Sequence, residues 1–505
     1  MNIQTIAEKY LKQAVIENKC SRGGNIIIMD PSNGDILAMA TYPDYDLNTP
    51  FEPNESLAET WEKLSDSEKN NKLQKMWRNK SVSDTYEPGS TFKLITASAA
   101  VEEGVAKTDT WGDFNCIGYE DVCGQKIHCT SVGHGAQTLR QALENSCNPA
   151  LIQLGRRLGA DKLYSYMEAF GLFNKTNIST SGEVTGIYFS EVGPVELATA
   201  SFGQRFTITP IQLITAVSAI ANDGVLMKPR LVKQVENPDT NTVTTVEPVE
   251  IRKVISKETS KKMTDMMESV VTEGGGKFGQ VKGYTIGGKT GTSEPSPGSE
   301  NDGYVSSFVA IAPVENTKVV VLLTLYDPNG SSFYGGTICA PVVSQVLSEV
   351  LPYMGIPADG EEENRNINTT NRAKNTDTIT LPDIRNKTAA EAKKILENAG
   401  LKCSISGNTD EIVTDQVPKP GTSLLSGAIV KTYTKGNDAR VSSSVPDLKG
   451  MSLSQAKNSL ESKNLNIKYT GSGKVISQNP TAGTSIEEGT VVTVTLQDDL
   501  NYLAH

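Results

Sequence analysis

The sequence contains no run of about 18 or more consecutive apolar residues, the length that a helix needs to cross a bilayer. It also lacks an N-terminal basic segment followed by an apolar stretch, the mark of a secretory signal. Seven cysteines in 505 residues are too few for a disulfide scaffold, and the odd number leaves at least one thiol unpaired. Basic residues are fewer than acidic ones, 48 against 59, and the resulting net charge of −11 argues against a nucleic-acid partner.

The length indicates more than one domain, because 505 residues exceed the roughly 100 to 200 typical of a single domain. An apolar content of 37% and a charged content of 21% are typical of soluble globular proteins. Composition changes sharply once, where residues 358–377 contain a single large aliphatic residue, Ile367, and cannot form a core. We therefore predict an N-terminal domain of residues 1–355 and a linker of residues 356–377.

An internal repeat follows the predicted linker. Residues 381–392 align with residues 445–456, and residues 416–423 align with residues 478–485. Each copy begins with a Pro-Asp turn, continues into a short amphipathic helix and ends in an alternating strand. We therefore predict two small modules, each with one helix over a small sheet, and a short tail. Their bounds are residues 378–436, residues 444–498 and residues 499–505.

The N-terminal domain contains patterns of both helices and strands. Residues 3–17 have the spacing of an amphipathic helix. Two apolar runs, residues 25–29 and 36–40, are joined through an Asn-Gly pair and predict a β-hairpin. Residues 318–325 form a continuous apolar run, which is typical of a strand buried on both faces. The domain is therefore predicted to be α/β, with a helix-rich middle.

A serine and a lysine lie three residues apart at the predicted start of a helix. Pro88 and Gly89 form a turn before Ser90, and Lys93 follows on the same helix face. A helix N-terminus stabilises developing negative charge, and a lysine kept neutral by apolar neighbours and a second cation can accept a proton from the serine. The pattern predicts a nucleophile, Ser90, and a base, Lys93. Alone it is weak, because solvated pairs at this spacing are common.

A second motif places Ser146 and Asn148 on either side of Cys147, just before a proline. In an extended turn, side chains two residues apart point the same way, so a hydroxyl could relay a proton while a carboxamide holds a substrate amide. The alternative interpretation is an Asx turn that ends a helix. This motif alone favours the structural interpretation.

A third motif is a glycine-rich strand within residues 283–293, where Lys289 alternates with Thr290 and Thr292. The glycines at 287, 288 and 291 leave the strand without side chains at these positions. A strand with so few side chains can accept a peptide-like ligand along its backbone, while Lys289 and the hydroxyls of Thr290 and Thr292 bind a carboxylate. The alternative is a glycine-rich bulge in an edge strand.

The three motifs, Ser-x-x-Lys, Ser-x-Asn and Lys-Thr-Gly, occur in the order found in the penicillin-recognising acyl-transferases. Residues 29–40, 78–93, 203–212 and 334–341 resemble the transpeptidase domain of class B penicillin-binding proteins of the division and sporulation branch, and the C-terminal repeats resemble PASTA modules. The resemblance covers nearly the whole chain. It implies an α/β (α+β) transpeptidase fold with a five-stranded antiparallel sheet and a helical subdomain, followed by two PASTA modules.

The resemblance also implies an activity, D,D-transpeptidation, and a role for each motif residue. Ser90 attacks the stem peptide while Lys93 takes its proton, and Ser146 returns a proton to the departing D-alanine. Asn148 holds the substrate amide, and Lys289 supports the proton network electrostatically.

Further roles implied by the resemblance concern the backbone and the substrate. The N–H groups of Ser90 and Thr292 form the oxyanion hole. Thr290 and Thr292, with Gly291 between them, bind the substrate or the carboxylate of a β-lactam. No Glu-x-x-x-Asn element, which a β-lactamase could use for deacylation, lies between Asn148 and Lys289, so a long-lived penicillin adduct is expected.

The implied partners are peptidoglycan stem peptides ending in D-Ala-D-Ala, β-lactam antibiotics and a membrane glycosyltransferase of the division or spore-cortex machinery; no cofactor is implied. Relatives carry an N-terminal membrane anchor, so this chain looks truncated, and the expected location is the extracytoplasmic face of the plasma membrane. A D,D-carboxypeptidase and a non-catalytic cell-wall protein that binds β-lactams or muropeptides stay open as alternatives.

The cysteines raise a separate question. Cys116, Cys123 and Cys129 lie near His128 and His134, but their gaps match no common zinc-finger spacing, so no metal is predicted. The resemblance to redox-controlled sporulation enzymes implies instead a disulfide between Cys116 and Cys129.

Overall fold

The computed structural model describes residues 2–237, 242–294, 303–358, 378–425, 427–435, 437, 439–451, 453–470 and 474–497. The chain divides into two compact units, Met1–Ile367 and Asn368–His505. Almost all of the predicted linker, residues 356–377, and the whole predicted tail, residues 499–505, lie outside the described residues. None of the helices in the described part of the chain is long and apolar enough to span a bilayer.

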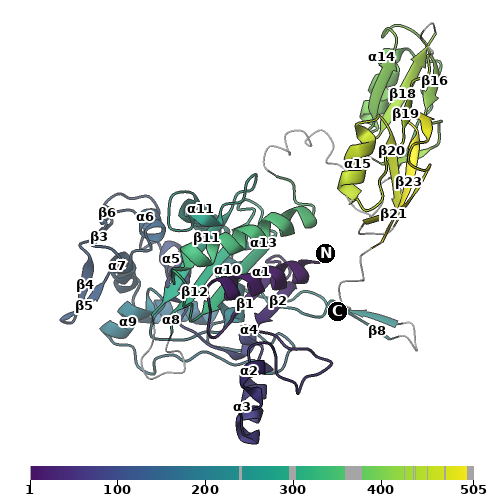
Figure 1. Ribbon diagram of the computed structural model, residues 1–505. Coiled ribbons are helices and arrows are strands. Elements are labelled where there is room, and N and C mark those ends of the chain that lie inside the picture. Colours follow the sequence, from purple (N-terminus) through teal and green to yellow (C-terminus); the bar gives the residue numbers. More distant parts are fainter. Residues whose placement is uncertain are drawn as a thin grey trace. The chain divides into compact units, whose positions relative to one another are not determined.

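A five-stranded antiparallel sheet forms the centre of the first unit (Figure 1). Its order is β11-β12-β13-β1-β2, so the N-terminal hairpin pairs with strands from the far end of the domain, and β11 lies at an edge. The predicted hairpin, the buried strand and the five-stranded sheet are confirmed. The strands are β1 Gly24–Met29, β2 Ile36–Tyr42, β11 Gly287–Ser293, β12 Val305–Ala312 and β13 Val319–Tyr326.

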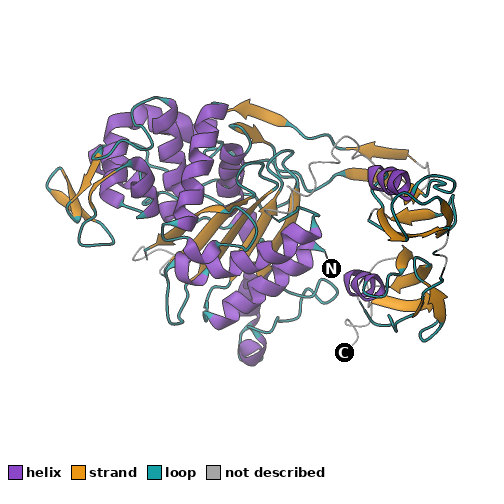
Figure 2. Ribbon diagram, turned by 90° about the horizontal axis from the view of Figure 1, so that it is seen from above, coloured by secondary structure: helices purple, strands orange, loops and turns teal. Residues whose placement is uncertain are grey.

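Helices cover both faces of this sheet (Figure 2), which explains why its three central strands, β12, β13 and β1, are buried along their whole length. Ile26 and Ile28 point into one core with α1 and α13, whereas Ile27 and Met29 point into the other core with the helical subdomain. The predicted N-terminal helix is confirmed with the same bounds, and Asn2 caps it by accepting from the Thr5 N–H. The helices on the first face are α1 Ile3–Glu17, α12 Gly335–Ile338 and α13 Ala340–Tyr353.

The predicted helix-rich middle is present and forms the subdomain on the other face of the sheet, where α11 packs on β11 and α10 packs on β13 and β1. Its principal helices are α5 Lys93–Glu102, α6 Leu139–Glu144, α7 Asn148–Leu158, α8 Ala160–Ala169, α9 Pro194–Ala200, α10 Pro210–Ala221 and α11 Lys257–Thr272. Short strands form pairs β3–β6 and β4–β5 between α5 and α6: β3 Phe114–Cys116, β4 Tyr119–Val122, β5 Gln125–His128 and β6 Gly135–Gln137.

The remaining elements of the first unit are short. They are α2 Ala58–Trp61, α3 Asp66–Met76, α4 Lys80–Ser83, the 3₁₀ turns η1 Gly89–Phe92 and η2 Lys277–Gly279, and the strands β7 Val225–Met227, β8 Gln234–Asn237, β9 Thr242–Thr245 and β10 Glu250–Lys253.

The second unit contains two modules of the same topology, which confirms the predicted repeat. In each, one helix packs on a three-stranded sheet whose central strand has one parallel and one antiparallel neighbour. The first module has β14 Thr378–Thr380, α14 Ala389–Asn398, β15 Lys402–Ser406, β16 Val413–Val417, β17 Ser423–Leu425 and β18 Ile429–Thr434. The second has β19 Ser442–Ser444, α15 Leu453–Glu461, β20 Asn466–Thr470, β21 Lys474–Asn479, β22 Ser485–Glu487 and β23 Val491–Gln497.

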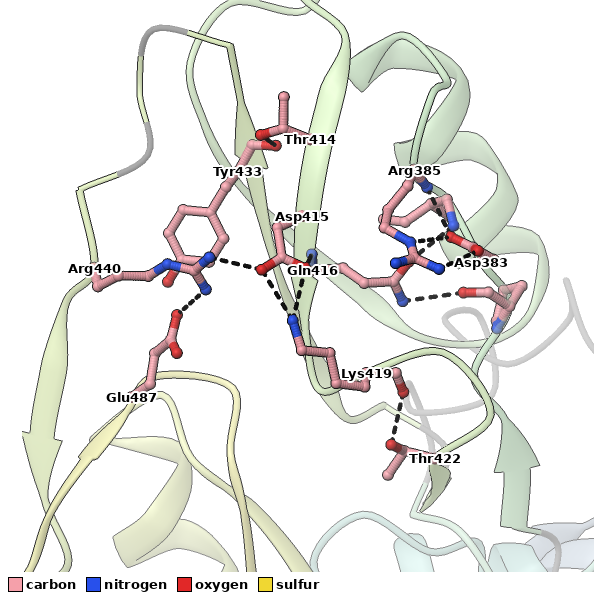
Figure 3. A network of polar contacts seen from close by, with 12 residues as sticks. Asp383, Arg385, Thr414, Asp415, Gln416, Lys419, Thr422, Tyr433, Arg440 and Glu487 are labelled. Atoms are coloured by element: carbon pink, nitrogen blue, oxygen red, sulfur yellow. Dashed lines mark hydrogen bonds and ion pairs between the residues drawn. The ribbon is translucent and has the colours of Figure 1, made fainter.

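A polar network links the two modules (Figure 3). Arg440 donates to Asp415 of the first module at 2.6 Å and to Glu487 of the second at 2.6 Å. Lys419 donates to the same Asp415 carboxylate at 2.9 Å. The Arg440 side chain is 43% exposed, so each of its ion pairs contributes at most about 1 kcal/mol.

Candidate active site

The segment that carries Ser90 is held between two other parts of the fold. It begins as the 3₁₀ turn η1, and α5 continues from Lys93, so the predicted helix start is present. Gly89 has φ +54°, and its N–H donates to the Gly203 carbonyl at 2.9 Å. A Cβ on Gly89 would lie 3.0 Å from the Thr292 carbonyl oxygen of β11. Ser90, which is partly exposed, therefore starts the helix directly beside the edge strand.

Gly203 supports this turn and gives a stability prediction. It has φ +89°, and a Cβ there would lie 2.1 Å from the Gly89 carbonyl oxygen. We expect Gly203→Ala to lower the free energy of unfolding by about 2 to 5 kcal/mol, the sum of left-handed backbone strain and overpacking. Gly104→Ala is the matched control, because Gly104 has φ +68° but nothing within 4 Å of its added Cβ. Urea unfolding would contradict the prediction if both variants lost equal stability.

Lys93 is a fully buried lysine that faces the Ser-x-Asn motif. Its Nζ donates to the Ser146 carbonyl oxygen at 2.6 Å, to the Asn148 Oδ1 at 2.7 Å and to the Ser146 Oγ at 3.2 Å. Burial lowers the pKa of Lys93 to about 7, against the raising effects of Cys147 and Cys129. Near neutral pH a large share of Lys93 is therefore uncharged and able to accept a proton.

Lys289, the lysine of the Lys-Thr-Gly motif on β11, also contacts the Ser146 hydroxyl. Its Nζ donates to the Ser146 Oγ at 3.0 Å, to the Thr290 carbonyl oxygen at 3.1 Å and to the Thr290 Oγ1 at 3.3 Å. Burial, and then the charge of Lys93, lower the pKa of Lys289 well below its usual range. The Ser146 hydroxyl thus bridges two buried amines, and positive charge on Lys93 disfavours protonation of Lys289, an arrangement suited to proton transfer.

The Ser-x-Asn turn differs from its predicted conformation. Instead of an extended turn, Ser146 has φ +49° and Asn148 is the first residue of α7. The two side chains still converge, because both contact Lys93, and the Asn148 Nδ2 also donates to the His128 carbonyl at 3.3 Å. The left-handed conformation of a serine costs about 1 kcal/mol or more, so the surrounding contacts must hold this turn in place.

The glycines of β11 have a reason that the sequence did not reveal. A Cβ on Gly288 would lie 2.6 Å from the Phe308 ring, and one on Gly291 would lie 2.3 Å from the Ser307 Oγ and 3.1 Å from the Pro88 carbonyl oxygen. These glycines therefore let β11 pack closely against its own neighbours. From the sequence, they were interpreted instead as leaving the strand open to a peptide-like ligand. Thr292 has a local partner too, since its Oγ1 accepts from the Gly335 N–H at 3.2 Å.

The cysteine prediction needs correction. Cys116 and Cys129 are both free in the structure, so the predicted disulfide is not formed there. They belong instead to a cluster with His134 and Cys147, whose four potential ligand atoms all lie within 4.8 Å of one another. Sequence spacing did not reveal this cluster, because it depends on the strand pairs β3–β6 and β4–β5 and on the packing of α7, which follows Cys147, against β3 and β5.

Known proteins share these domains. Residues 24–348 match the family described as the penicillin binding protein transpeptidase domain, and residues 379–434 and 443–498 each match the PASTA domain.

Individual relatives agree with this assignment. Stage V sporulation protein D of Bacillus subtilis is 37% identical over 448 residues, which cover 87% of this chain and 65% of that protein, just under two thirds of its length. Peptidoglycan D,D-transpeptidase PbpA of Mycolicibacterium smegmatis is 31% identical over 69% of this chain and 72% of its own length. The solved penicillin-binding protein 3 of Mycobacterium tuberculosis superposes with a TM-score of 0.60 and 25% identity, covering 70% of this chain and 78% of that one.

Proposed function

Because the chain belongs to the penicillin-binding protein transpeptidase family, we propose that it is a serine D,D-transpeptidase that cross-links peptidoglycan stem peptides. The observation that carries the proposal is the pair of buried lysines on either side of the Ser146 hydroxyl. One of them, Lys93, has a pKa of about 7 and follows Ser90 by one helical turn. A pure binding protein has no use for a neutral amine placed beside a serine at a helix start.

Acylation follows from this arrangement. The Ser90 Oγ attacks the carbonyl carbon of the penultimate D-alanine while the neutral Lys93 Nζ takes the hydroxyl proton. The backbone N–H groups of Ser90 and Thr292 stabilise the oxyanion, which is consistent with the packing of η1 against β11. The C–N bond then breaks, and the nitrogen of the terminal D-alanine takes a proton through Ser146, which the two lysine amines contact.

Substrate contacts use the other motif residues. Asn148, whose carboxamide is oriented by Lys93 and the His128 carbonyl, holds the backbone amide of the donor peptide. Thr290 and Thr292 receive the terminal carboxylate of the peptide or of a β-lactam, Gly291 keeps the strand close to η1, and the Lys289 Nζ holds the Thr290 hydroxyl in place. The edge position of β11 leaves room for an extended peptide alongside it.

The acyl group then passes to an amine of a neighbouring stem peptide. We propose that this occurs on the extracytoplasmic face of the plasma membrane, where the substrate lies, in partnership with a membrane glycosyltransferase of the division or spore-cortex machinery. Relatives with peptidoglycan D,D-transpeptidase names and the two PASTA domains support this context.

A donor peptide ending in D-Ala-D-Ala tests the proposed reaction and separates it from its alternatives. With a stem-peptide amine present, we expect D-alanine release together with a cross-linked product, both measured by mass spectrometry, and a fluorescent penicillin adduct that lasts for many minutes. Release of D-alanine without any cross-linked product would favour a D,D-carboxypeptidase. A folded protein that neither releases D-alanine nor forms the adduct would favour the non-catalytic alternative.

A further inference from the structure

We propose that Cys116, Cys129, His134 and Cys147 form a binding site for one zinc ion, next to the Ser-x-Asn turn. Their four ligand atoms lie within 4.8 Å of one another. In a tetrahedral zinc site, with Zn–S bonds of about 2.3 Å and Zn–N bonds of about 2.0 Å, the ligand atoms are about 3.5 to 3.8 Å apart. The Cys129 Sγ lies 3.6 Å from the His134 Nδ1 and 4.0 Å from the Cys147 Sγ, close to these values.

The local fold orients these side chains before any ion binds. In the β3–β6 pair, Cys116 lies opposite Gly135, so His134, the residue directly before β6, enters the cluster from the adjoining segment. Cys129 is fixed by its N–H, which donates to the Gly118 carbonyl at 2.8 Å. Three separate chain segments therefore converge on one point, which is typical of a built site.

The histidine has the hydrogen bond expected of a zinc ligand. Its Nε2 contacts the Ser131 hydroxyl at 3.0 Å, which leaves Nδ1 facing Cys129. A ligating imidazole commonly uses its second nitrogen in this way, because the contact fixes both the tautomer and the ring orientation. Cys116 and Cys147 are 1% and 0% exposed, whereas Cys129 and His134 are partly exposed, so an ion can reach the site from their side.

Zinc fits the donor set better than other common ions. Three cysteines and one histidine form a closed set of four, typical of structural zinc, whereas calcium and magnesium require oxygen ligands. A disulfide is a poorer fit, because its sulfur atoms would be about 2.05 Å apart and one pair would leave two further donors unexplained.

The position of Cys147 gives the ion a consequence for the active site. Cys147 stands between Ser146 and Asn148, and Ser146 has a left-handed backbone conformation that its neighbours must maintain. A zinc ion bound to Cys147 would anchor this turn to the β3–β6 and β4–β5 strands. The cluster residues are therefore positioning residues, and this consequence, unlike metal binding itself, rests on the proposed function.

Metal analysis of the purified full chain, prepared with reductant and then incubated with zinc and desalted, tests the site directly. We expect one zinc ion per chain in the wild type and in Cys123→Ser, whose exposed cysteine lies outside the cluster. Cys116→Ser and His134→Ala should lose the ion. Should either variant fail to fold, cobalt binding to the wild type provides a second test, since tetrahedral thiolate-bound Co²⁺ gives a characteristic visible absorption.

Two outcomes would overturn the site: no metal in the folded, fully reduced wild type, or equal zinc in Cys116→Ser and the wild type. The catalytic consequence has a separate readout. Chelation should lower the melting temperature and slow penicillin acylation about 10-fold or more, with recovery on adding zinc. If zinc binds as expected but no acylation occurs in any form, the proposed function fails while the zinc site stands.

Discussion

Replacing Ser90 with alanine is expected to abolish covalent labelling by a fluorescent penicillin, with a loss of at least about 1,000-fold in the acylation rate. The physical reason is that the Ser90 Oγ forms the bond to the acyl group, so no other part of the site can substitute for it. Ser90 lies in the short η1 turn and is partly exposed, and removal of its oxygen should leave the packing unchanged. Gel fluorescence over time, with peptide mass spectrometry of the wild-type adduct, measures the effect.

Ser98→Ala is the matched control for this change. Ser98 is a buried serine further along α5, and its hydroxyl donates only locally, to the Leu94 carbonyl at 2.7 Å. We expect this variant to label at the wild-type rate. An adduct on Ser90→Ala, or one that maps to another residue of the wild type, would show that the nucleophile has been misassigned.

Replacing Lys93 with methionine is expected to slow acylation by about 100- to 10,000-fold, the range for loss of a positioned base. Methionine fills a similar volume and carries no charge, so the buried site loses its proton acceptor without gaining a cavity. Reversible binding of the β-lactam before acylation should change much less than the acylation rate constant. Stopped-flow labelling at several drug concentrations separates the two quantities.

The pH dependence of the acylation rate tests whether Lys93 acts as the base or only as a structural support. Only the neutral amine accepts a proton, and burial lowers the pKa of Lys93 to about 7. The wild-type acylation rate should therefore rise with pH between about 5 and 8 and reach half its maximum near the pKa, whereas Lys93→Met should lose this rise. Lys107→Met, on the exposed loop after α5, should keep the wild-type profile. An unchanged pH profile in Lys93→Met would exclude Lys93 as the base.

Several features could be predicted from local patterns. The helix of residues 3–17, the β1–β2 hairpin and the repeated C-terminal modules all follow from periodicity and turn residues within short windows of sequence. The lowered pKa of Lys93 was also expected from its apolar neighbours. The expected second cation acts differently, however, because the charge of Lys93 lowers the pKa of Lys289.

Other features depend on segments that are far apart in sequence. Ser146 and Lys289 are separated by 143 positions, yet their side-chain atoms lie 3.0 Å apart, because β11 packs against η1 while α7 packs against α5, the helix that continues from η1. No local pattern encodes such a distance. The left-handed conformation of Ser146 and the contacts that require glycine at 203 and 291 arise in the same way, from backbone that approaches after folding.

The sequence by itself determined the order of the three motifs, the family that they indicate and the repeated modules, because each of these is written in contiguous residues. Only the tertiary structure decided that Cys116, Cys129, His134 and Cys147 converge, and that the first two are free cysteines in a four-residue cluster. The reason is that strand pairing and the packing of α7 against β3 and β5, rather than spacing along the chain, set the distances between their side chains.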